Sequence, residues 1–158
     1  MNTQLAKSYK SSSIETATPG QLVLMLYDGA LRFMTQAEQG LHETNVRVRN
    51  ETVNNNLIKA QNILAELQNS LDMKVPGDFP KTMWGLYDFM MRQLQQANMQ
   101  KSAEPIKTVK KMLKDIRDAW DEMLKKLSKE SAEAAAAAAA AAPAEVGQKV
   151  GGGLNVSA

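Results

Sequence analysis

The chain has 158 residues, 44% hydrophobic, 23% charged and 5% aromatic, a composition that favours one helical domain with tails over a sheet-rich fold. It contains no cysteine, which excludes disulfides, thiolate metal sites and cysteine nucleophiles and fits the reducing cytosol, where we expect the protein to reside. The net charge of +2 is too small to indicate nucleic acid. No stretch reaches the roughly 18 apolar residues that cross a bilayer, so stable membrane insertion is not expected either.

The first 17 residues are polar and rich in serine, and they lack the apolar core of a cleavable signal peptide. We expect a mobile arm here, which docks when Leu5, Tyr9 and Ile14 find a groove. The arm should end at Thr18, whose hydroxyl can cap a helix, and Pro19 suits the first helical position. A helix is therefore predicted to begin at Pro19.

Apolar residues at helical spacing predict a bundle domain over residues 18–130. The first helix carries two adjoining stripes up to residue 41, and the second carries Leu57 and Leu64 on one stripe that ends near residue 72. Prolines at positions 76 and 80 predict a loop, because they remove amide donors. A third helix is expected over residues 83–97 and a fourth from about residue 105 to 127. Four long amphipathic helices with short connections predict an all-α, antiparallel four-helix bundle.

Residues 131–158 form a tail outside this domain. The alanine run Ala134–Ala142 predicts an extension of the last helix into solvent, where it frays, because alanine favours helix but offers little surface to pack. The glycine-rich end after Pro143 is expected to be disordered. A cloning or fusion scar is the alternative origin of the final segment.

The side chains of a catalytic or cofactor site are almost absent. His42 is the single histidine and lies in a polar segment between helices, where a solvated surface role is the simpler interpretation. Acids and lysines of the last helix alternate at i to i+4 spacing, which is typical of an exposed helical face. Neither Glu-x-x-His nor Gly-x-x-x-x-Gly-Lys occurs, so we expect no enzyme, no metal and no cofactor.

Four blocks of sequence, in order, carry a resemblance to a known family. They are TATPGQLVLMLYDGALRF at 16–33, NLIKAQNILAEL at 56–67, LYDFMMRQLQQAN at 86–98 and IRDAW at 116–120. In this combination the chain resembles the FliS family of flagellar secretion chaperones over most of residues 5–127. The alanine and glycine tail falls outside the resemblance.

The resemblance implies a helical bundle that binds the C-terminal segment of flagellin, keeps it from polymerising early and delivers it to the flagellar type III export apparatus. Contact with the export gate is also implied, and Tyr9 stands in the family's N-terminal tyrosine position. We expect a monomer or a weak dimer. The alternative from another functional class is a structural or regulatory adaptor that self-associates through the same apolar grooves.

Candidate partner-binding residues follow from these blocks, each beside a plainer structural role. Leu57 and Leu64 fit the core stripe or a groove, whereas Gln61 could hydrogen-bond a bound backbone. Tyr87 and Arg92 could offer a hydroxyl and a guanidinium to a partner, or simply pack and solvate.

Met91 belongs to a methionine-rich stretch of the third helix, where flexible thioethers could adapt to a partner helix or fill the core. Arg117 and Asp118 are expected to brace neighbouring helices, and Trp120 lies on the core stripe.

Overall fold

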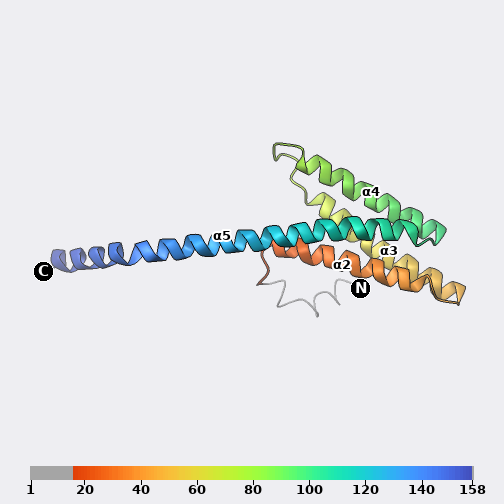
Figure 1. Ribbon diagram of the computed structural model, residues 1–158, viewed down its shortest axis with the longest axis horizontal. Helices are drawn as coiled ribbons and strands as arrows, with labels where there is room; N and C mark the ends of the chain where they lie inside the picture. Colours follow the sequence, from red (N-terminus) through yellow and green to blue (C-terminus); the bar gives the residue numbers. More distant parts are fainter. Residues whose placement is uncertain (1–15, 158) are drawn as a thin grey trace. The chain divides into compact units, whose positions relative to one another are not determined.

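The computed structural model describes residues 16–157, with side-chain detail for residues 16–141. The chain divides into two compact units, Met1–Trp120 and Asp121–Ala158. The described residues form helices and no strand: α2 (Pro19–Gly40), α3 (Val46–Asn69), α4 (Phe79–Gln100) and α5 (Glu104–Ser157). The predicted all-α fold with four helices is confirmed. Figure 1 shows α2, α3, α4 and the start of α5 following one another through short connections.

Local sequence signals fix where these helices begin. Thr18 and Gln21 form a reciprocal capping box. The backbone amide of Gln21 donates to Thr18 Oγ1 at 3.2 Å, and the backbone amide of Thr18 donates to Gln21 Oε1 at 3.0 Å. Asn45 caps α3 by accepting from the Val48 amide at 3.1 Å. The predicted start of the first helix at Pro19 is confirmed.

The connection between α3 and α4 differs from the sequence prediction. The prolines predict a loop that includes Phe79 and Pro80, but α4 begins at Phe79 and Pro80 lies in its first turn. A proline is tolerated there because the amide that it lacks would have no partner within the helix. The loop is therefore shorter than predicted, and Phe79 is the first residue of α4.

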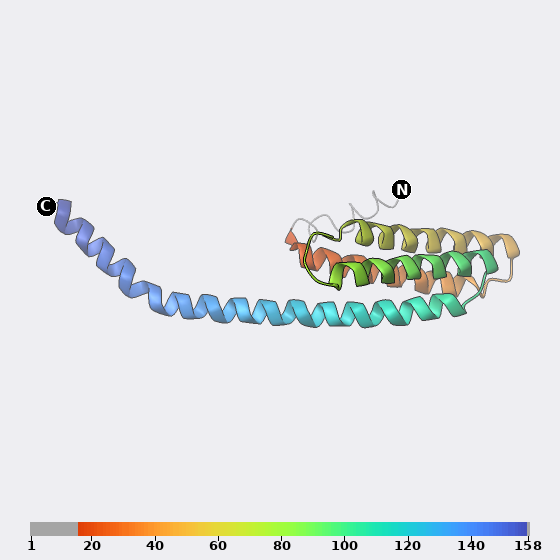
Figure 2. The ribbon, with the colours of Figure 1, turned by 90° about the horizontal axis from the view of Figure 1, so that it is seen from above.

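The core of the first unit is built from the predicted stripes. Its fully buried members come from all four helices, and α3 contributes one residue per turn, as its three-and-four spacing requires. Figure 2 shows α2, α3 and α4 lying alongside one another. The largest of these side chains are Tyr27, Met34, Leu57, Leu64, Leu67, Met90, Leu94, Ile106 and Leu113.

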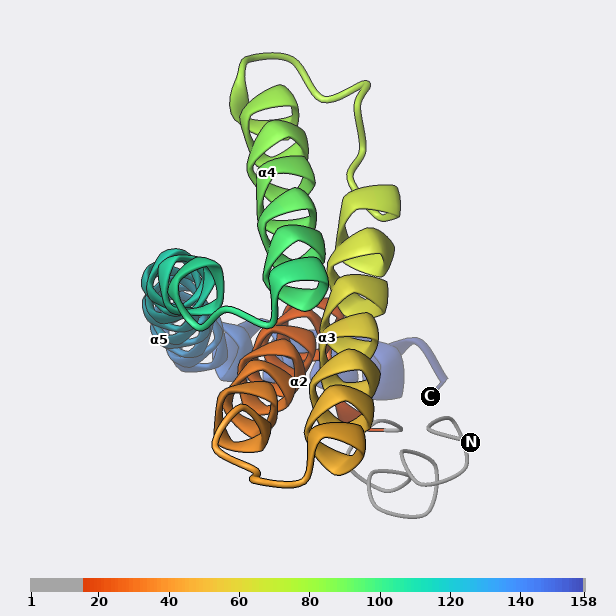
Figure 3. The ribbon, with the colours of Figure 1, turned by 90° about the vertical axis from the view of Figure 1, so that its right-hand side faces the viewer.

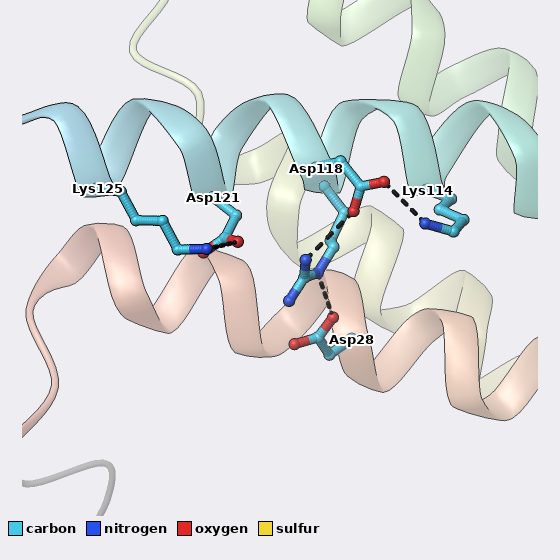
Figure 4. A network of polar contacts seen from close by, with 6 residues as sticks. Asp28, Lys114, Asp118, Asp121 and Lys125 are labelled. Carbon is cyan, nitrogen blue, oxygen red and sulfur yellow. Dashed lines mark hydrogen bonds and ion pairs between the residues drawn. The ribbon is translucent and has the colours of Figure 1, made fainter.

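Helix α5 is joined to α2 by long side chains. Arg117 Nε donates to Asp28 Oδ1 at 2.8 Å, and Lys110 Nζ lies 2.6 Å from Glu38 Oε1. Figure 4 shows Asp28 below α5, with Asp118 turned towards Lys114 on the same helix. The prediction that Arg117 braces a neighbouring helix is confirmed, whereas Asp118 pairs within α5.

In the second unit, α5 continues from Asp121 to Ser157. The Lys125 ammonium pairs with Asp121 Oδ2 at 3.0 Å, one of the predicted i to i+4 pairs. The helix passes Pro143 and the glycine-rich end, beyond the point at which the composition predicts an irregular segment. Fraying of the C-terminal part of α5 concerns the stability of the helix and stays a prediction.

Candidate functional site

A pocket of about 180 Å³ opens at the end of the first unit where α3 finishes and α4 begins. Figures 1 and 3 show that α4 diverges, towards its first residues, from the part of α5 that belongs to the first unit, residues 104–120. All four helices contribute to the lining, which is mostly apolar. Its residues are Val23, Tyr27, Leu67, Ser70, Leu71, Asp72, Phe79, Met83, Tyr87 and Trp120.

Two buried tyrosines from different helices line this pocket and bond to each other. The hydroxyls of Tyr27 on α2 and Tyr87 on α4 lie 2.6 Å apart and share a hydrogen bond, and each residue is 2% exposed. Burial raises the pKa of both phenols above the ordinary value of 10.0 because desolvation disfavours the phenolate. Both hydroxyls therefore keep their protons at physiological pH.

Trp120 forms the α5 side of the pocket. Its ring stands edge-on to Tyr27, with centroids 6.4 Å apart and an interplanar angle of 85°, a favourable arrangement for aromatic pairs. The indole Nε1 donates to the Gly20 carbonyl at 2.8 Å. This bond links α5 to the first turn of α2, so the pocket lies beside the point where residues 1–17 join the bundle.

One apolar residue of the lining is exposed: Phe79, in the first turn of α4, leaves 61% of its surface in solvent. Met73 and Val75 in the preceding loop are exposed as well, although they do not line the pocket. An exposed apolar side chain at a concave site is typical of a protein-binding region. The arrangement can hold apolar side chains of a partner.

The polar groups at the rim are engaged locally. Ser70 Oγ donates to the Leu67 carbonyl at 2.7 Å, and Asp72 Oδ1 accepts from the Lys74 amide at 3.0 Å. Among the side chains described, those of residues 16–141, no group of three acidic, histidine or cysteine residues could hold a metal ion. No helix in the described part of the protein combines the length and apolarity that crossing a bilayer requires.

The candidate residues from the sequence fall into different places. Tyr87 lines the pocket, but it is buried and bonded to Tyr27 rather than exposed. Leu57 and Leu64 are fully buried in the core, which agrees with the plainer of their two interpretations. Gln61 Nε2 donates to the Met91 carbonyl at 3.0 Å and so ties α3 to α4.

The remaining candidates lie outside the pocket. Met91 is half-buried against the core, and Arg92 is exposed and pairs with Asp88 at 2.9 Å, one turn earlier in α4. Leu5, Tyr9 and Ile14 lie outside the described residues. Partner contact by these residues stays a prediction.

Sequence reasoning does not select most of the pocket residues. Val23, Leu67 and Met83 have the spacing of ordinary core positions, and Phe79 is predicted to lie in a loop. The available signal is an aromatic residue directly before a proline, because a proline in the first turn of a helix places the preceding residue at the start of the helix.

Comparisons with known proteins identify the family. The model of the flagellar protein FliS matches residues 1–127. A flagellar secretion chaperone FliS from Bacillus subtilis is 42% identical over 93 residues, which cover 59% of this chain and 65% of that protein. Its counterpart from Salmonella typhimurium is 35% identical over 108 residues, 65% of this chain and 77% of the relative.

A solved structure confirms the fold. The crystal structure of a flagellar chaperone from bacteria aligns with 80% of this chain and 99% of its own length, with a TM-score of 0.61 and 21% sequence identity. At 21% sequence identity, this similarity supports the fold alone. The match of the family model over residues 1–127 shows that the chain belongs to the FliS family of flagellar proteins, a family of chaperones and not of enzymes.

Proposed function

We propose that this protein is a secretion chaperone that binds the C-terminal segment of flagellin, prevents its premature polymerisation and delivers it to the flagellar type III export apparatus. The supporting observation is the apolar pocket with its exposed Phe79 rim, to which four helices contribute. Family membership supports the class of partner. The working compartment is the cytosol, and the protein acts as a monomer or weak dimer.

The physical basis of the proposal is coupled folding and binding. A segment that is disordered before binding can insert apolar anchors into a preformed pocket, and ordering it costs roughly 2–5 kcal/mol of the gross interaction energy. The net affinity is therefore moderate for the surface buried. A chaperone that must release its cargo at an export gate benefits from this balance.

The N-terminal arm is the second part of the proposal. Leu5, Tyr9 and Ile14 contact the groove or the export gate, and Tyr9→Ala is expected to change binding while the bundle stays folded. The described structure supports this with one contact: Trp120, a pocket residue, bonds to Gly20 at the start of α2. The arm therefore joins the bundle next to the pocket. Gln61, Met91 and Arg92 extend the proposed surface along α3 and α4.

Replacing Phe79 tests the site. Phe79→Ala removes an exposed pocket aromatic, so we expect the Kd for the flagellin C-terminal segment, measured by calorimetry, to rise about tenfold, as for an interface anchor. Trp84→Ala is the matched control, because Trp84 is also an exposed aromatic of α4, at 45%, but does not line the pocket. Equal affinities of the Phe79 variant and the parent would place cargo binding elsewhere. A parent protein that does not bind the segment would refute the proposed function itself.

A further inference from the structure

The Tyr27–Tyr87 pair contains one more hydrogen-bond donor than it uses. Each neutral phenol carries one O–H donor and can also accept. The 2.6 Å contact between the two oxygens uses one proton, whichever residue donates it. The second proton therefore needs an acceptor from outside the pair.

The described residues do not supply that acceptor. Neither hydroxyl has a second hydrogen-bond partner within residues 16–141. Ser70 and Asp72 also line the pocket, but neither is bonded to a tyrosine: Ser70 Oγ donates to the Leu67 carbonyl, and Asp72 Oδ1 accepts from the Lys74 amide. The other lining residues, such as Val23, are largely apolar. A buried donor without an acceptor is costly, which makes the pocket selective for an occupant that satisfies it.

We propose that the paired hydroxyls of Tyr27 and Tyr87 donate their second proton to an acceptor oxygen of the segment that fills the pocket. The inference rests on the proposed function and specifies the chemistry of the cargo at this point. The acceptor is a neutral carbonyl, either a backbone carbonyl oxygen or the amide oxygen of Asn or Gln. A carboxylate is disfavoured, because Asp72 also lines the pocket and the walls would desolvate a second negative charge.

This arrangement provides specificity that apolar packing alone lacks. A wholly apolar anchor would leave the second hydroxyl proton unbonded in a site from which water has been displaced. An anchor whose apolar side chains flank one carbonyl would satisfy it. The tyrosine pair thus favours a segment in which a helix ends, or in which Asn or Gln follows an apolar residue, because such segments present free carbonyl oxygens.

Single and double phenylalanine variants test the inference. In Tyr27→Phe or Tyr87→Phe, the remaining hydroxyl has no partner in the pair and can donate to the cargo directly. We expect the Kd for the flagellin C-terminal segment to change by less than about threefold in either single variant. In the double variant no donor remains, and the Kd should rise about tenfold, the effect of one hydrogen bond. Thr35→Val is the matched control, since it removes a part-buried hydroxyl that donates to the Leu31 carbonyl outside the pocket.

The opposite pattern would overturn the inference. If the pair makes no bond to the cargo, the double variant, which lacks both hydroxyls, binds the segment with the Kd of the parent. Failure of the proposed function is distinguishable, because it appears as absent binding in the parent protein.

If the double variant does not fold, a spectroscopic measurement tests the proposed hydrogen bond instead. In a Tyr9→Phe background the protein retains only Tyr27 and Tyr87 of its three tyrosines. At saturation with a tyrosine-free flagellin segment, a new phenol donor bond should shift the near-ultraviolet tyrosine absorption to the red. An unshifted spectrum at saturation would contradict the proposed bond.

Discussion

Arg117 on α5 donates through Nε to Asp28 Oδ1 on α2 at 2.8 Å, across 89 positions of sequence. Both side chains are partly exposed, 28% for Arg117 and 44% for Asp28. This ion pair and the Lys110–Glu38 pair act along the same α2–α5 seam. Because Trp120 bonds to Gly20 at the end of that seam, the Arg117–Asp28 pair helps to hold the α5 wall of the pocket against α2.

Asp28→Asn should weaken the α2–α5 seam. The substitution keeps the side-chain shape but removes the charge that pairs with Arg117, so we expect the free energy of unfolding to fall by about 0.5–1 kcal/mol, as for a half-exposed pair. Urea denaturation measures this loss, which should shrink in high salt. The control is Glu51→Gln, because the Arg47–Glu51 pair is far more exposed, at 86% and 61%. Losses of the same size in both variants would show that the Arg117–Asp28 pair has no special role.

The helices could be predicted from sequence because their signals are local. The Thr18 cap depends on neighbours within one turn, and the spacing of Leu57 and Leu64 alone places them on the buried face. The predicted brace by Arg117 is also confirmed, although the sequence could not name Asp28 as its partner. Local patterns therefore account for most of the fold.

The pocket could not be predicted because it depends on which stripes of different helices meet. Tyr27 and Tyr87 are 60 residues apart, and each alone resembles an ordinary core aromatic. Their contact follows from the packing of α2, α3 and α4, which spacing along one helix does not specify. Phe79 is missed for a local reason, since the proline after it is a loop signal as well as a residue suited to the first turn of a helix.

Asp118 should make the stability of the bundle depend on acidic pH. The pKa of its carboxyl is lowered from the ordinary value of 3.8, first because Lys114 Nζ donates to it at 2.8 Å and further because Arg117 donates at 3.2 Å. The unfolded chain therefore binds this proton more readily than the folded one. The contribution is fully present above pH 3.8 and is lost as the pH falls through the lower folded-state pKa.

Melting curves of Asp118→Asn and the parent across acidic pH check this dependence. We expect the parent to melt at a higher temperature near neutral pH and the two midpoints to converge as the pH falls. Glu122→Gln controls for the loss of one negative charge on the same helix. A constant difference between the Asp118 variant and the parent from neutral to strongly acidic pH would contradict the linkage.

Gly40 and Gly85 should respond in opposite ways to the same substitution. A Cβ on Gly40 would lie 2.8 Å from Thr52 Cγ2 on α3, and the β-branched threonine has little rotamer freedom with which to move away. Gly40→Ala should therefore lower the free energy of unfolding by about 1–3 kcal/mol through overpacking of the α2–α3 contact.

Gly85 lies within α4, with nothing within 4 Å of the added carbon. Gly85→Ala should raise the free energy of unfolding by roughly 0.5–1 kcal/mol, because alanine restricts the unfolded chain and favours helix. Because the two sites share no contact, the double variant should show the sum of the two changes in urea denaturation. A stabilised Gly40 variant would mean that α2 and α3 can separate at this point without loss, and that close backbone packing there is not required.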